Sequence, residues 1–226
     1  MISEGAVTLL THDGVTLEAR LGLPPTPAGG VVVCHPHPLY GGDMDNPVVV
    51  RVAEVCGELG LATLRFNFRG VGASTGRHGH GRDEQHDLAA ALAHLASVLP
   101  TGALLALAGY SFGATVAAHL ASEPPDSPTL AAVALIAPPL AMTGDEPFGA
   151  LAHPAIPILV VAGDQDEYCP LPALQALGRS MPSVEIKIVE GANHFFFGKL
   201  YPLGEAVAAW ARALEARQAG RGRGAG

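Results

Sequence analysis

Cysteine is scarce in this chain of 226 residues. The three cysteines, Cys34, Cys56 and Cys169, are odd in number and follow no motif spacing, which argues against a disulfide framework. We therefore expect a protein of a reducing compartment, with the cytoplasm as the simplest location.

Basic residues are also few, with 13 Lys and Arg against 21 Asp and Glu, so the net charge is −8. This balance argues against binding to nucleic acids or to anionic membrane surfaces. The sequence has no apolar run of about 18 residues that would span a bilayer. Its first residues, Met1–Ala6, lack the basic and apolar regions of a signal peptide. A small molecule is the expected partner, and the sequence does not define an oligomeric state.

Charged residues make up only 15% of the chain and apolar residues 49%, so a large core is expected. No repeat or long linker divides the sequence, which predicts a single domain over residues 1–217. The remaining segment, 218–226, is rich in Gly and Arg and is predicted to be a disordered tail.

The pattern of apolar segments predicts an α/β fold. Residues 7–10 and 15–20 alternate around Asp13-Gly14, which predicts an antiparallel hairpin. After the hairpin, near-continuous apolar runs alternate with helical segments, which is typical of a mostly parallel central sheet with helices on both faces. The expected strands are 31–35, 62–68, 104–110, 130–137, 158–162 and 184–189. The expected helices are 47–59, 83–99, 112–121, 172–180 and 201–217.

The segment 104–121 carries the strongest chemical signal. An apolar strand ends at Gly109-Tyr110-Ser111-Phe112-Gly113, and an Ala-rich helix begins at once. This Gly-x-Ser-x-Gly pattern between strand and helix is typical of a nucleophile elbow, a sharp turn that exposes a serine hydroxyl. The pattern also occurs around Ser74, but no helix follows there, so Ser74 is interpreted as a loop serine.

A serine nucleophile needs a base and an acid that orients the base. His194 follows the last predicted strand and is the candidate base, while Asp166 follows the strand before it and is the preferred acid. Asp164 is the alternative acid and Glu167 a weaker one. Asp164 lies close to the strand end, where it could bind the turn. All of these residues are expected at the carboxyl edge of the sheet, beside Ser111.

Acyl transfer also needs two backbone N–H groups that bind the oxyanion. Phe112, directly after the nucleophile, supplies the first. The second is expected in His35–Gly42, where Pro36 and Pro38 have no N–H. His37 is therefore the first candidate, through its backbone rather than its imidazole, and Leu39 and Tyr40 remain alternatives.

Taken together, these motifs resemble the α/β-hydrolase superfamily and, more narrowly, small lidless bacterial serine hydrolases. The matching segments are Cys34–Gly42, Arg65–Gly72, Gly109–Gly113, Gly163–Glu167 and Asn193–Phe196. The resemblance implies an α/β-hydrolase fold with the order Ser, Asp, His, and supports Asp166 as the second aspartate of a Gly-x-x-Asp turn. Only about twenty residues separate the strands 130–137 and 158–162, so no substantial lid is expected.

The function that the resemblance implies is a serine carboxylesterase acting on small or short-acyl esters, without a cofactor. A thioesterase or peptidase with the same catalytic residues and a catalytically silent binding module are the alternatives. Tyr40 and Phe195 are candidate substrate-binding residues that could instead belong to the core.

Other polar clusters are given structural roles. The pattern His35-x-His37 is not interpreted as a metal site, because two prolines stiffen it, and no metal is predicted. The histidines of 78–86 are interpreted as part of a solvated loop, and Arg65 and Arg69 as partners of acidic side chains.

Overall fold

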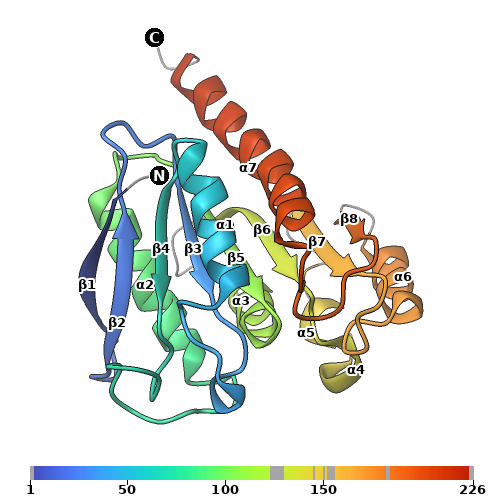
Figure 1. The fold of residues 1–226 in the computed structure, drawn as a ribbon. Coiled ribbons are helices and arrows are strands. Elements are labelled where there is room, and N and C mark those ends of the chain that lie inside the picture. Colours follow the sequence, from blue (N-terminus) through green and yellow to red (C-terminus); the bar gives the residue numbers. More distant parts are fainter. Residues whose placement is uncertain are drawn as a thin grey trace.

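A sheet of eight strands forms the centre of the molecule in the computed structural model, which describes residues 3–122, 130–144, 146–149, 151, 156–181 and 184–223. The strand order is β1-β2-β4-β3-β5-β6-β7-β8 (Figure 1). The strands are β1 Glu4–Leu10, β2 Thr16–Gly22, β3 Gly30–Cys34, β4 Ala62–Phe66, β5 Leu105–Tyr110, β6 Leu130–Ile136, β7 Ile158–Gly163 and β8 Val184–Val189.

The hairpin of β1 and β2 lies at one edge of this sheet. Its strands pair antiparallel with Leu10 opposite Thr16, and Gly14 donates a backbone hydrogen bond to the carbonyl of Thr11. β2 in turn pairs antiparallel with β4, whereas the pairs from β4 through β8 are parallel. The predicted fold class, including the N-terminal hairpin, is therefore confirmed.

Helices cover both faces of the sheet (Figure 1). They are η1 Pro38–Tyr40, α1 Pro47–Glu58, α2 Glu84–Val98, α3 Phe112–Ser122, α4 Leu140–Thr143, α5 Glu146–Gly149, α6 Leu171–Ser180 and α7 Leu200–Arg223. α1 and α7 pack together on one face, and α2 and α3 pack together on the other.

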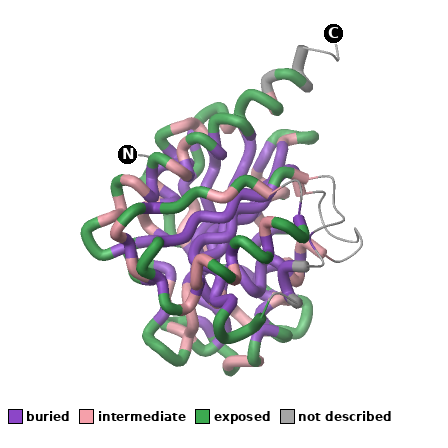
Figure 2. Tube along the Cα trace, turned by 90° about the vertical axis from the view of Figure 1, so that its right-hand side faces the viewer, coloured by how far each residue is buried: buried purple, intermediate pink, exposed green. Residues whose placement is uncertain are grey.

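The two layers of helices explain why the parallel strands lack polar alternation. In β3, Val31 and Val33 join the core beneath α1 and α7, while Val32 and Cys34 join the core beneath α2 and α3. Every residue of β3 is buried, and Figure 2 shows the strands as a buried band inside the more exposed helices. Covering both faces removes each strand residue from water, so apolar residues are favoured at every position.

Two buried arginines fix the end of β4 and the loop that follows. Arg65 contacts Glu4 and Asp45, and Arg69 donates from Nη2 to Asp87 Oδ1 at 2.7 Å. Asp87 on α2 is fully buried, so this pair ties the loop after β4 to that helix. The interpretation of both arginines as partners of acidic side chains is confirmed.

The segment between β6 and β7 carries little secondary structure among the described residues. Between β6 and β7 the described residues form only the two short helices α4 and α5, in line with the expected absence of a substantial lid.

At the C-terminus, α7 continues to Arg223, and Gln218 accepts a hydrogen bond from Leu104 N at 2.8 Å. Residues 218–223 are thus helical where a disordered tail was expected, and 224–226 lie outside the described residues. Within the described ranges, no helix has both the length and the apolarity needed to cross a membrane.

Candidate active site

Ser111 occupies the turn between β5 and α3 in a backbone conformation that most residues avoid. Its φ is +54°, in the left-handed region, which costs free energy for a residue with a Cβ. The flanking glycines make the turn possible. A Cβ on Gly109 would lie 2.3 Å from the carbonyl oxygen of Gly113, and one on Gly113 would lie 2.6 Å from the carbonyl oxygen of Cys34. Both contacts are with backbone, so larger residues would move the serine.

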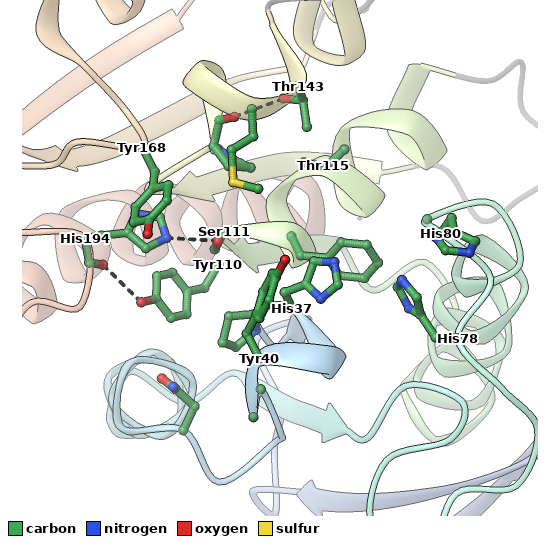
Figure 3. A pocket seen from close by; sticks show the side chains of 18 of the residues that line it. His37, Tyr40, His78, His80, Tyr110, Ser111, Thr115, Thr143, Tyr168 and His194 are labelled. Atoms are coloured by element: carbon green, nitrogen blue, oxygen red, sulfur yellow. Dashed lines mark hydrogen bonds between the residues drawn. The ribbon is translucent and has the colours of Figure 1, made fainter.

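The structure brings Ser111, His194 and Asp166 into a hydrogen-bonded series. His194 Nε2 lies 3.0 Å from Ser111 Oγ (Figure 3), and His194 Nδ1 lies 2.9 Å from Asp166 Oδ2. The three residues come from the loops after β5, β7 and β8 at the carboxyl edge of the sheet, and all three are buried.

The two other acidic candidates lie elsewhere. Asp164 is exposed and its Oδ1 accepts a hydrogen bond from Gly191 N at 2.7 Å, which fixes the turn after β8. Glu167 is exposed as well. Asp166 Oδ1 accepts hydrogen bonds from the backbone N–H groups of Tyr168 and Cys169 at 2.9 and 3.0 Å. These bonds hold the Asp166 carboxylate in its orientation toward His194.

The loop that carries His194 is held from two sides. The hydroxyl of Tyr110 donates a hydrogen bond to the carbonyl of His194 at 3.0 Å, and burial raises the pKa of this tyrosine, so it remains a donor (Figure 3). Phe196 is fully buried in the core beneath α7 although its φ is +52°. This anchored phenylalanine fixes the backbone on the other side of the histidine.

The two candidate oxyanion donors lie beside each other. The rings of His37 and Phe112 are 4.9 Å apart, and both residues line the same pocket as Ser111. Among the described residues, neither backbone N–H has a hydrogen-bond acceptor. The His37 imidazole accepts a bond from Leu39 N at 3.2 Å and thereby caps η1. This contact fits a role of His37 through its backbone, as the sequence suggested.

His35 supports the segment that carries His37. It is fully buried, its Nε2 accepts a hydrogen bond from Phe68 N at 3.0 Å, and its Nδ1 donates to the carbonyl of Pro36 at 2.6 Å. These partners require a neutral ring with the proton on Nδ1. Burial lowers the pKa of His35 from 6.5 to about 4, although the contact with Pro36 acts in the opposite direction.

This lowered pKa predicts a pH dependence of stability. Unfolded His35 takes up a proton near pH 6.5, whereas folded His35 stays neutral until about pH 4. Its contribution is therefore present above pH 6.5 and is lost as the pH falls toward 4, by about 3 kcal/mol in total. We expect the stability difference between the wild type and His35→Gln to shrink by that amount between pH 7 and pH 4, measured by urea unfolding. Parallel pH profiles of the two proteins would contradict this assignment.

Ser111 opens into a cavity of about 660 Å³, within the usual range for ligand sites. The predicted substrate-binding residues Tyr40 and Phe195 both line it, and their side chains are 79% and 49% exposed. They are not core residues. Several lining residues of α3, α4 and the loop after β7 were not predicted from the sequence; these are Thr115, His119, Met142 and Tyr168. Thr115 and His119 follow Ser111 at intervals of four residues, so helical periodicity could have indicated them.

The histidine-rich segment is a loop, as expected, and His80 is exposed, but the sequence did not indicate that two of its histidines line a cavity. His78 and His80 line the same cavity as Ser111 (Figure 3).

The interpretation of Ser74 as a loop serine is confirmed, since its hydroxyl donates to the Asn67 carbonyl at 2.7 Å and accepts from Glu18 N at 2.9 Å. The three cysteines are buried and unpaired, and burial raises the thiol pKa of each.

The strand order, the strained serine turn and its neighbouring histidine define a hydrolase of the α/β class. A model of the alpha/beta hydrolase domain family matches residues 31–212, and the chain belongs to that family.

This chain has relatives of similar length, and the two with solved structures described below have the same fold. An uncharacterized protein of Rickettsia prowazekii, RP471, is 34% identical over 182 residues, which cover 78% of this chain and 75% of that protein. The structure of an alpha-beta serine hydrolase homologue from Coxiella burnetii is 37% identical with a TM-score of 0.81, over 92% of this chain and 97% of the other. XC6422 from Xanthomonas campestris, a serine hydrolase without a lid, is 33% identical with a TM-score of 0.80, over 93% and 94%.

Proposed function

We propose that this protein is a serine carboxylesterase that cleaves small or short-acyl esters through an acyl-enzyme intermediate. His194 takes the proton of Ser111 as the serine oxygen attacks the ester carbonyl. The negative charge on the tetrahedral oxygen is bound by the N–H groups of Phe112 and His37. Asp166 holds the imidazole with its proton on Nδ1 and stabilises the imidazolium.

The second half of the cycle uses the same groups. His194 gives its proton to the leaving alcohol, which departs as the carbonyl reforms. A water molecule then attacks the acyl-enzyme while His194 again acts as base, and the acid is released with Ser111 restored. Each of these steps uses only the side chains and backbone amides named above, the substrate and one water molecule.

One observation carries this proposal, namely the distance of 3.0 Å between His194 Nε2 and Ser111 Oγ at the base of an open cavity. A serine at its normal pKa is a weak nucleophile, and a base within hydrogen-bond reach is what activates it. The relatives described as serine hydrolases support the same chemistry. The preference for short chains rests on the short helix α4, which lines the cavity through Met142 and Thr143 and offers little apolar cover for a long acyl chain.

A panel of p-nitrophenyl esters from acetate to palmitate tests the proposal. We expect kcat/KM to be highest for the short esters and to fall as the chain extends beyond the cavity. The thioester and the anilide of the best acyl group are measured in parallel. Turnover of the thioester or the anilide without turnover of any ester would replace the carboxylesterase with a thioesterase or a peptidase.

A further inference from the structure

The wall of the cavity away from His194 is rich in histidine. Figure 3 shows His37, His78 and His80 on this side, facing the same space as Ser111. None of the described lining residues is an Asp, Glu, Lys or Arg. The ionisable lining residues are the histidines 37, 78, 80, 119 and 194 and the tyrosines 40, 110 and 168. The charge of this cavity therefore depends on imidazoles, and no carboxylate within this set repels an anion.

The three histidines form a contiguous group. The ring of His78 lies 5.0 Å from that of His37 and 4.9 Å from that of His80. They do not converge on a point as metal ligands do. Within the described residues, the one group of His, Cys, Asp or Glu with metal-like spacing is His12, Asp13 and His86, and it lies outside the cavity lining.

A buried carboxylate holds the two loop histidines in place. Glu84 of α2 is fully buried, and its Oε1 and Oε2 accept hydrogen bonds from Gly79 N and Gly81 N, each at 2.8 Å. His80 stands between these two amides with a φ of +55°, an unusual conformation for an exposed histidine. Strain of this kind persists where the surroundings impose it and is common at ligand sites. The loop is therefore built to present His78 and His80 to the cavity.

The nearby carboxylates already have cationic or histidine partners, and they do not pair with every histidine of this group. His78 Nδ1 lies 2.8 Å from Glu84 Oε1, a close contact without the alignment of a hydrogen bond, so Glu84 offsets a charge on His78. The other nearby carboxylate, Asp83, faces Arg69 at 3.8 Å. His37 and His80 have no such partner among the described residues. Burial, and then the neighbouring His78, lower the pKa of His37, while Glu84 acts in the opposite direction. A bound anion would relieve the repulsion between the two histidines.

The hydrogen-bonding groups of this wall suit a carboxylate. An imidazole N–H donates, and a carboxylate offers two oxygens that accept.

We propose that this histidine wall, formed by His37, His78 and His80, binds a free carboxylate of the substrate. The preferred substrates are then esters that carry a second, ionised carboxyl group, on either the acyl or the alcohol portion. This inference rests on the proposed esterase function, because Ser111 must attack the ester bond of the same molecule.

Two pairs of substrates test the inference. Methyl hydrogen adipate against dimethyl adipate places the carboxylate on the acyl side. 4-Acetoxybenzoate against its methyl ester places the carboxylate on the alcohol side. We expect kcat/KM to favour the carboxylate member of one pair about tenfold at pH 7, the size of a charge-assisted hydrogen bond. The favoured pair identifies the side of the scissile bond that faces the histidine wall.

The variant His80→Asp makes the test specific. Asp accepts a left-handed backbone and is exposed here, so the fold is retained, while its charge repels a carboxylate. We expect the ratio of carboxylate to neutral ester to fall at least about tenfold. His12→Asp, the same charge change at an exposed histidine outside the cavity, is the control and leaves the ratio as in the wild type.

The outcomes separate the two proposals. If the neutral esters are hydrolysed and neither pair favours the carboxylate, or if His80→Asp leaves the ratio unchanged, the histidine wall does not bind a carboxylate. If no ester of either kind is hydrolysed, the esterase function itself fails.

Discussion

Replacing Ser111 by alanine is expected to lower kcat for ester hydrolysis by about 10⁴- to 10⁶-fold, the range seen when a serine nucleophile is removed. The same change is expected to abolish covalent labelling by a fluorophosphonate probe, measured by intact-protein mass. The reason is the position of Oγ, 3.0 Å from His194 Nε2, where its proton can be removed. Alanine adopts the φ of +54° at a cost similar to that of serine, so the melting temperature should change little.

Ser74→Ala is the matched control, because Ser74 stands in the other Gly-x-Ser-x-Gly of the chain. Its hydroxyl links Glu18 N and the Asn67 carbonyl, and removing it leaves both groups without this partner. We expect stability to fall by about 1–3 kcal/mol while labelling stays complete. Labelling that survives in Ser111→Ala but is lost in Ser74→Ala would exchange the roles of the two serines.

The fold could be predicted from the sequence because the patterns that indicate its strands and turns are local. The apolar runs that became β3 through β7 predict buried parallel strands, and the Asp13-Gly14 turn predicts the hairpin. The geometry at Ser111 was likewise predictable, because Gly109 approaches residues four and five positions later in the chain and Gly113 approaches the end of the neighbouring strand β3. The positions of His194 and Asp166 followed from the rule that parallel strands end at one edge.

The histidine wall could not be predicted from the same signals. His78 and His80 stand in a polar, Gly-rich segment, which in sequence is indistinguishable from a solvated loop. What turns them toward the cavity is the buried Glu84, whose two oxygens bind amides three and five residues earlier in the chain. A glutamate in the first turn of a helix normally stabilises that helix from the surface. Its burial is a tertiary property, because it depends on how α2 packs beside α3.

The assignment of the acid to Asp166, and not to Asp164, predicts a large loss of activity when Asp166 is replaced. Asp166→Asn is expected to lower kcat by about 10³- to 10⁴-fold with the fold unchanged. Asn can keep a carbonyl oxygen at the Oδ1 position, where it accepts from Tyr168 N and Cys169 N. Its NH₂ group then takes the Oδ2 position, 2.9 Å from His194 Nδ1. Two donors cannot face each other, so the imidazole moves its proton to Nε2 and can no longer accept the proton of Ser111.

Asp164→Asn provides the control for this argument. Asp164 Oδ1 accepts a single hydrogen bond from Gly191 N, and an asparagine oxygen can accept the same bond. We therefore expect activity within a few-fold of the wild type, measured as kcat on the best short-chain ester, and equal melting temperatures for the two variants. A large loss in Asp164→Asn with little loss in Asp166→Asn would assign the acid to Asp164. That result would require the loop after β7 to rearrange when substrate binds, because Asp164 now faces Gly191 and His194 Nδ1 faces Asp166.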